Sequence, residues 1–138
     1  MHDLILFTDG SVNAQSKVGY GAYLLVSDPD LSFAQLQRQV QVKRFAPTSS
    51  TKLELQTLLW ALCENNPLNR QVIIYTDSQN LIGLPARRER LEQNDYRSKQ
   101  NRRLNNYQLY QEFYRLTDQF DCRLVKVRGH QAAKHKDE

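Results

Sequence analysis

Two short apolar runs, each followed by an aspartate, are the strongest features of the hydrophobic pattern. Residues 4–7 read Leu-Ile-Leu-Phe before Thr-Asp-Gly-Ser, and residues 72–75 read Val-Ile-Ile-Tyr before Thr-Asp-Ser. Uninterrupted apolar runs of this kind are typical of strands buried on both faces. If the two strands lie side by side and parallel, Asp9 and Asp77 meet at one edge of the sheet, where α/β proteins place their ligand sites.

The remaining strands are less apolar. Residues Tyr23–Val26 predict a second strand, and the alternation within Leu36–Phe45 predicts a half-exposed third strand. Short connections favour an antiparallel meander of these two with the first strand. Residues Arg123–Val127 predict the last strand.

One helix separates the two apolar runs. Residues Thr51–Glu54 have the pattern of a capping box, and leucines follow at near-helical spacing. The helix should end before the Asn-Asn-Pro sequence that starts at Asn65. A crossover through this helix would make the strand at residues 72–75 parallel to the first strand.

Two more helices follow the second apolar run. The first begins at Ser78 and should stop near Leu84, because Pro85 has no backbone N–H. The second is amphipathic and covers the aromatic-rich residues 104–120. No repeat or linker divides the chain, so we expect a single domain over residues 1–138.

The positive charge is concentrated in one segment. The chain of 138 residues has a formal net charge of +4, and residues 86–103 hold seven basic and three acidic residues. This concentration favours a polyanionic partner, although a solvated helical face of alternating charge has the same composition. The basic residues are Arg87, Arg88, Arg90, Arg97, Lys99, Arg102 and Arg103.

The composition also argues against some classes of protein. No apolar run approaches the roughly 18 residues that span a bilayer, and no signal peptide is visible. Cys63 and Cys122 are isolated and form neither a disulfide framework nor a zinc motif. We therefore expect a cytoplasmic protein without a membrane partner or an obligate protein partner.

Asp9, Asp77 and Glu54 each have an ordinary structural explanation, as a turn residue, a helix cap and the acid of the capping box. Together they predict chemistry, because the helix that carries Glu54 can place it over the edge shared by Asp9 and Asp77. Three carboxylates in one pocket repel each other unless a hard cation neutralises them. Oxygen-only ligands suit Mg²⁺ or Mn²⁺, and two such ions between carboxylates recur in nucleases.

Five short motifs occur in the order and with the spacing of ribonuclease H of type I, which the sequence resembles over essentially its whole length. The motifs are Thr8–Ser11, Gly19–Ala22, Leu53–Leu55, Thr76–Gln79 and Val125–His130. The resemblance implies an α/β fold with a five-stranded mixed sheet, an antiparallel three-stranded meander plus two parallel strands, flanked by helices. It also implies Mg²⁺-dependent endonucleolytic cleavage of the RNA strand of an RNA–DNA hybrid.

The resemblance places metal-binding acids on Asp9, Glu54, Asp77 and Asp137, and a histidine that assists proton transfer or product departure on His130. The family usually has its fourth acid further beyond the histidine, at the start of a final helix. Asp137 would therefore follow a shortened loop, and we expect the domain to lack the family's C-terminal helix.

Substrate contacts are implied in four places. They are the polar side chains after the first aspartate, the hydroxyls before the glutamate helix that would hold DNA-strand phosphates, the glutamine after the second aspartate, and the basic segment, which resembles a substrate-binding handle. The residues are Ser11, Asn13, Ser49, Ser50, Thr51, Gln79, Arg87, Arg88 and Arg90. Alternative functions are a nucleic-acid-binding module with impaired catalysis, or another nuclease or strand-transfer enzyme on the same scaffold.

Overall fold

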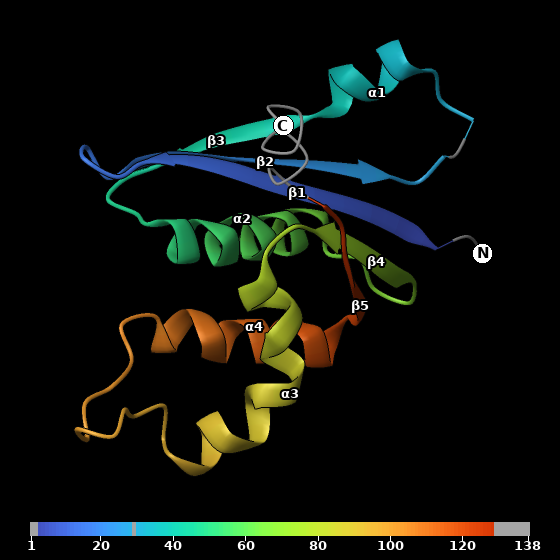
Figure 1. The fold of residues 1–138 in the computed structure, drawn as a ribbon. Helices are drawn as coiled ribbons and strands as arrows, with labels where there is room; N and C mark the ends of the chain where they lie inside the picture. The colour runs from blue at the N-terminus through green and yellow to red at the C-terminus, as the bar shows by residue number, and fades with distance from the viewer. Residues whose placement is uncertain (1–2, 29, 129–138) are drawn as a thin grey trace.

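The computed structural model describes residues 3–28 and 30–128, which form a five-stranded sheet and four helices (Figure 1). The strands are β1 (Leu4–Asn13), β2 (Val18–Val26), β3 (Gln41–Phe45), β4 (Gln71–Thr76) and β5 (Asp121–Lys126). The helices are α1 (Phe33–Gln39), α2 (Ser50–Asn65), α3 (Gln79–Gln93) and α4 (Tyr107–Gln119).

The sheet has the strand order β3-β2-β1-β4-β5. The first three strands form an antiparallel meander, β4 is parallel to β1, and β5 is parallel to β4. The predicted mixed sheet is confirmed, including the parallel pairing of the two apolar runs. Their ladder ends where Phe7 is aligned with Tyr75, two residues before each aspartate.

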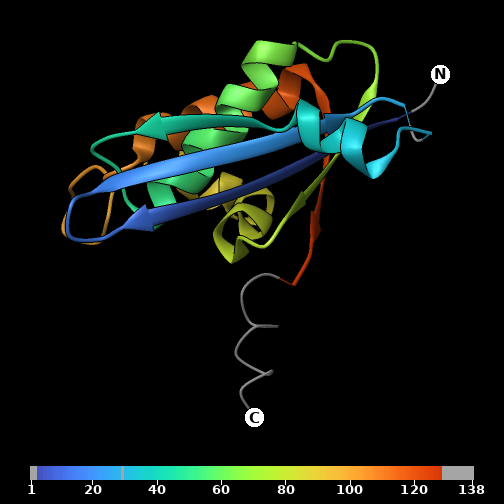
Figure 2. The same ribbon diagram turned by 90° about the horizontal axis from the view of Figure 1, so that it is seen from above.

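The three longer helices pack on one face of this sheet (Figures 1 and 2). Leu6 and Ile74 point toward them and are fully buried. Phe7 points to the opposite face, where it is 43% exposed and stacks on Tyr75 with ring centroids 5.2 Å apart. The prediction that the apolar runs are buried on both faces was therefore wrong, because side chains alternate along a strand and the long helices of the described residues cover one face.

Small residues allow α2 to lie very close to the sheet. A Cβ atom on Gly10 or Gly19 would be 2.9 Å from Leu53, and one on Gly21 would be 2.1 Å from the Thr57 hydroxyl oxygen. Thr57 is fully buried, and its hydroxyl donates to the Leu53 carbonyl at 2.7 Å. The glycines of β1 and β2 thus set how closely the first turns of α2 approach the sheet.

The predicted third strand is only half right. Residues 33–39 form α1, and only Gln41–Phe45 form β3. Ser32 and Gln35 make a reciprocal capping box that stabilises the start of α1. None of the α1 residues is buried. The spacing of its apolar residues therefore does not reflect packing against the core.

The boundaries of α2 and α3 also differ from the prediction. Ser49, not Thr51, is the N-cap of α2, and its hydroxyl accepts from the Lys52 N–H at 3.3 Å. Helix α3 does not stop at Pro85 but continues to Gln93. Helices α3 and α4 pack together through a hydrogen bond that the Tyr114 hydroxyl donates to the buried Leu84 carbonyl at 2.6 Å.

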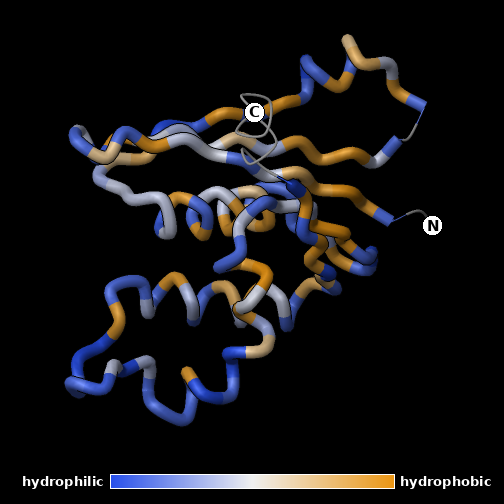
Figure 3. Tube along the Cα trace, viewed as in Figure 1, coloured by the Kyte–Doolittle hydropathy of each residue, from blue (hydrophilic) through white to orange (hydrophobic). Residues whose placement is uncertain are grey.

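Hydrophobic residues concentrate in the strands and on the helix faces between them, whereas the segment that links α3 to α4 is largely hydrophilic (Figure 3). That segment contains most of the predicted basic residues. No helix within residues 3–28 and 30–128 is long and apolar enough to cross a membrane.

Candidate active site

A cavity of about 70 Å³ opens beyond the carboxyl end of β4, beside the middle of β1 and the first turns of α2 and α3. Its wall includes Asp9 from β1, Glu54 from α2 and Asp77 from the loop after β4. The structure therefore brings the three predicted acids to one cavity, although they are far apart in the sequence.

The sequence had suggested that Asp9 follows the end of the first strand. The structure instead places Asp9 within β1. Strand β1 continues to Asn13 in its ladder with β2, whereas its ladder with β4 stops at Phe7. Asp9 thus lies beyond the last residue of β1 that pairs with β4. The cavity lies beside this unpaired part of β1. One carboxylate oxygen of Asp9 accepts from the Gly10 N–H at 2.8 Å.

Glu54 and Asp77 are not used as helix caps. With Ser49 as the N-cap, Glu54 is the fifth residue of α2, so it is not the acid of a capping box. Ser78 is the N-cap of α3, and its hydroxyl accepts from the Leu81 N–H at 3.1 Å. The structure removes the ordinary explanations of both acids and leaves their carboxylates beside the cavity.

The environment of Glu54 disfavours its ionised form. Burial raises the pKa of the Glu54 carboxyl above its ordinary value, and the negative charge of Asp77 raises it further. A hydrogen bond with the Ser78 side chain acts in the opposite direction and lowers this pKa. Glu54 and Asp77 repel each other in one cavity, and a bound cation would stabilise both ionised carboxylates.

The chemistry of these donors fits a hard divalent cation, since all are carboxylate oxygens. Within residues 3–28 and 30–128, however, no three histidine, cysteine, aspartate or glutamate side chains lie close enough together to hold a metal ion. Asp9, Glu54 and Asp77 therefore line the same cavity, but their carboxylates are not close enough together to form a metal-binding cluster. Two predicted site residues, His130 and Asp137, lie outside the described residues.

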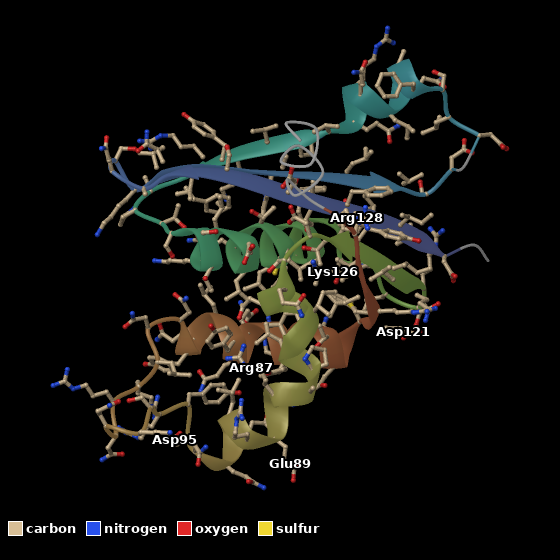
Figure 4. All side chains as sticks on the ribbon, viewed as in Figure 1. Arg87, Glu89, Asp95, Asp121, Lys126 and Arg128 are labelled. Atoms are coloured by element: carbon tan, nitrogen blue, oxygen red, sulfur yellow. The ribbon has the colours of Figure 1, made fainter. Side chains whose placement is uncertain are left out.

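Positive charge reaches the same edge of the sheet from β5. The Val127 N–H donates to the Thr76 carbonyl at 2.9 Å, which continues the parallel alignment up to Asp77. Lys126 and Arg128 flank this contact and are exposed (Figure 4). The sequence analysis missed both residues; their signal was the Val-Lys-Val-Arg run before Gly-His.

The predicted hydroxyl and amide contacts are spread around the cavity. Ser50 lines it, Ser49 caps α2, and Thr51 is half-buried in the first turn of α2. Asn13 accepts from the backbone N–H groups of residues 15 and 16 and so shapes the β1–β2 turn. Ser11 on β1 and Gln79, the first residue of α3, are exposed.

The arginines of the basic segment differ in what they contact. Arg88 donates to both carboxylate oxygens of Asp118 at 2.6 and 2.7 Å and to Glu92 at 3.1 Å, and it lowers the pKa of the Asp118 carboxyl. Arg87 donates to the Asn80 side chain at 3.1 Å and lies over the Tyr110 ring, between α3 and α4 (Figure 4).

Arg90 differs from these two arginines. It is exposed on α3, and no ion pair of its side chain is found in the described part of the chain. Of the three predicted contacts in this segment, Arg90 is therefore the one whose guanidinium is left to solvent.

Comparison with known proteins gives one family and one fold. A family model described as RNase H matches residues 1–138, which is the whole chain. The foamy viral protease-reverse transcriptase in complex with RNA/DNA hybrid is similar in structure, with a TM-score of 0.72 and 11% sequence identity over 97% of this chain and 18% of that chain. The same viral protein in complex with dsDNA gives a TM-score of 0.72 and 13% identity over 96% of this chain and 87% of that chain. At these identities the likeness shows the fold alone, and no curated protein sequence matches significantly.

Proposed function

The chain belongs to the RNase H family, and from this membership we propose that it is an endonuclease that hydrolyses the RNA strand of RNA–DNA hybrids. The observation that carries the proposal is the single cavity lined by Asp9, Glu54 and Asp77. It lies at the edge of the sheet where the family's motifs meet, and the structural neighbours in complex with RNA/DNA hybrid and with dsDNA support nucleic acid as the substrate.

We assign the cavity to divalent metal ions, with Asp9, Glu54 and Asp77 as ligands and Asp137 as the fourth. Two ions of Mg²⁺, or Mn²⁺ in its place, would supply an activated nucleophile and stabilise charge on the leaving oxygen when bound. Burial and the charge of Asp77 disfavour the ionised form of Glu54, and a nearby cation would offset both effects. His130 would assist proton transfer or product departure.

The remaining residues would bind and orient the duplex. Hydroxyls at the start of α2, from Ser49, Ser50 and Thr51, would contact phosphates of the DNA strand, as would the exposed guanidinium of Arg90. The further contacts proposed for this surface are Ser11, Asn13, Gln79, Arg87 and Arg88. Selection of RNA would rest on the 2′-hydroxyl, the group that distinguishes RNA from DNA. We place this activity in the cytoplasm.

A cleavage assay on a labelled RNA–DNA hybrid, with and without Mg²⁺, tests the proposal. We expect internal cuts in the RNA strand with Mg²⁺ and none with a chelator, and no cutting of double-stranded DNA. Asp9→Asn should lose cleavage while still binding the hybrid. A parent protein that binds the hybrid without cutting it would instead favour the binding module, and cutting of double-stranded DNA would favour another nuclease.

A further inference from the structure

Lys126 and Arg128 are two exposed cations that none of the contacts proposed above uses. Lys126 ends β5, and the Val127 N–H donates to the Thr76 carbonyl at 2.9 Å, which continues the alignment of the chain with β4 beyond Lys126. Side chains two residues apart in an extended chain point to the same side, so the two cations share one face. Within residues 3–28 and 30–128, neither side chain forms an ion pair.

The register of β5 places these cations beside the cavity. Lys126 is aligned with Thr76 in the parallel ladder, so the two side chains leave the sheet on the same side. Thr76 and the next residue, Asp77, line the cavity. Because neighbouring strands are about 4.8 Å apart, the backbone of Lys126 is one strand spacing from the cavity wall. Figure 4 shows Lys126 and Arg128 together at this end of β5.

The cations and the hydroxyls of α2 lie on opposite sides of the cavity. The first turns of α2 cover β1 and β2, where Leu53 meets the glycines of both strands. Strand β5 lies on the far side of β4 from these strands. A nucleic-acid strand that crosses the cavity from α2 toward β5 therefore reaches Lys126 and Arg128.

A strand that enters the cavity needs positive charge beside it. Its phosphates approach three carboxylates, those of Asp9, Glu54 and Asp77, and like charges repel. Cations at the rim of the cavity offset this repulsion and attract the polyanion to the site. Lys126 offers a compact charge with three donors, and Arg128 offers a planar fork that can hold two oxygens of one phosphate.

We propose that Lys126 and Arg128 bind phosphates of the RNA strand, next to the phosphate that lies in the cavity. The inference rests on the proposed function, because it names contacts for the strand which that function cuts. It also divides the contacts between the two strands of the hybrid. The hydroxyls at the start of α2 hold the DNA strand, and the end of β5 holds the RNA strand.

The competing explanation is that these cations only protect an exposed edge. Strand β5 is at the edge of the sheet, and charged side chains on edge strands discourage pairing with other chains. Arg123 is the matched control, because it is exposed on the same strand but is aligned with Ile73. Its side chain is three residues before Lys126 and therefore points to the opposite face of the sheet.

The first test measures binding of a labelled RNA–DNA hybrid at several salt concentrations, in a chelator so that nothing is cut. We expect Lys126→Gln and Arg128→Gln each to reduce the slope of log affinity against log salt by about 0.9, and the double variant by about 1.8. Lys126→Arg and Arg128→Lys keep the charge and should keep the parent's slope, as should Arg123→Gln. All these positions are exposed, so each variant should unfold at the parent's temperature.

The second test identifies the strand that the cations contact. Two hybrids carry neutral methylphosphonate linkages over the same central base pairs, one in the RNA strand and one in the DNA strand. Neutral linkages in the RNA strand should weaken binding by the parent and change binding by the double variant much less, because that contact is already lost. Neutral linkages in the DNA strand should weaken binding by both proteins by the same factor.

A parent-like salt slope in the double variant would overturn the inference, and so would an equal reduction of the slope by Arg123→Gln. A double variant that is insensitive to neutral linkages in the DNA strand and not in the RNA strand would overturn it as well. All three results leave the proposed function intact. Cleavage by the parent in Mg²⁺ is measured separately; if the parent cuts neither strand, the proposed function fails, and the inference fails with it.

Discussion

At the scale of single residues, the acids of the cavity illustrate how function and stability oppose each other. Glu54 is held near Asp77 and away from water, and its pKa is raised by burial and by that neighbouring charge. A group with a higher pKa in the folded than in the unfolded state binds its proton more tightly when folded, so its ionisation destabilises the fold. A cation in the cavity would reverse this cost.

Replacing Glu54 by glutamine should therefore stabilise the metal-free protein. Above the raised pKa the parent carries the cost of a partly buried charge and Glu54→Gln does not, whereas below the ordinary value of 4.5 both side chains are neutral and the difference should vanish. The measurement is the free energy of unfolding of both proteins in denaturant, at pH 7 and at a pH below 4.5, with a chelator present.

Glu89→Gln is the control for that comparison, because it removes the same charge from an exposed position on α3 (Figure 4). A variant Glu54→Gln no more stable than Glu89→Gln at neutral pH would show that the fold does not disfavour the Glu54 charge.

At the scale of elements, the approach of α2 to the sheet decides where Glu54 lies. Gly10, Gly19 and Gly21 of β1 and β2 lie under Leu53 and Thr57 of α2. Leu53 directly precedes Glu54, and Thr57 follows it by three residues. A Cβ at Gly21 displaces the helix, because Thr57 is buried and bonded to its own helix, whereas a Cβ at Gly10 meets only the end of the Leu53 side chain.

We expect Gly21→Ala to destabilise the protein by about 1–3 kcal/mol, because the new Cβ would overlap the Thr57 hydroxyl. Gly83→Ala is the matched control: its Cβ would be no closer than 4.0 Å to another side chain, and alanine should stabilise the interior of α3 by about 0.5–1 kcal/mol. Urea unfolding reports both, and equal effects of the two substitutions would contradict a close contact at Gly21.

The arginines of α3 should differ in how much they contribute to the stability of the fold. Arg88→Gln should lower stability by up to about 1 kcal/mol, since it removes a largely solvent-exposed ion pair with Asp118. Arg90→Gln should leave stability unchanged, weaken hybrid binding, and reduce the slope of log affinity against log salt by about one. Binding titrations at several salt concentrations test this, and an unchanged slope for Arg90→Gln would mean that Arg90 is only solvated.

At the scale of the whole molecule, the sheet has two unlike faces and one functional edge. The face toward α2, α3 and α4 holds the core, and the edge beyond β4 carries acids from three elements with Lys126 and Arg128 beside them. Ligands that bind only the folded state should therefore stabilise the molecule as a whole.

Mg²⁺ should raise the midpoint of thermal unfolding of the parent. At a hundredfold excess over its Kd, one bound ion adds about 2.7 kcal/mol to the free energy of unfolding. Asp9→Asn should lose most of this gain, although it should be at least as stable as the parent in a chelator. An identical Mg²⁺-induced shift in both proteins would argue that the ion binds elsewhere.

The sequence by itself determined the antiparallel pairing of the first three strands and the parallel pairing of the two apolar runs. Two apolar runs joined through a helix were expected to pair in parallel, and they do, which brings the aspartate after each run to the same cavity. These features depend on local patterns and on chain connectivity, so they can be read from consecutive residues. The helix that carries Glu54 was found in the same way, and it ends at Asn65, one residue beyond the predicted end.

Only the tertiary structure decided which face of each strand is covered, which acids cap helices and which cations are already paired. Phe7 and Ser49 differ from what their neighbours in the sequence suggested, and Arg88 is paired with Asp118, because their environments depend on distant elements. Burial and hydrogen bonding depend on residues that are distant in the sequence and close in space, so they cannot be read from consecutive residues.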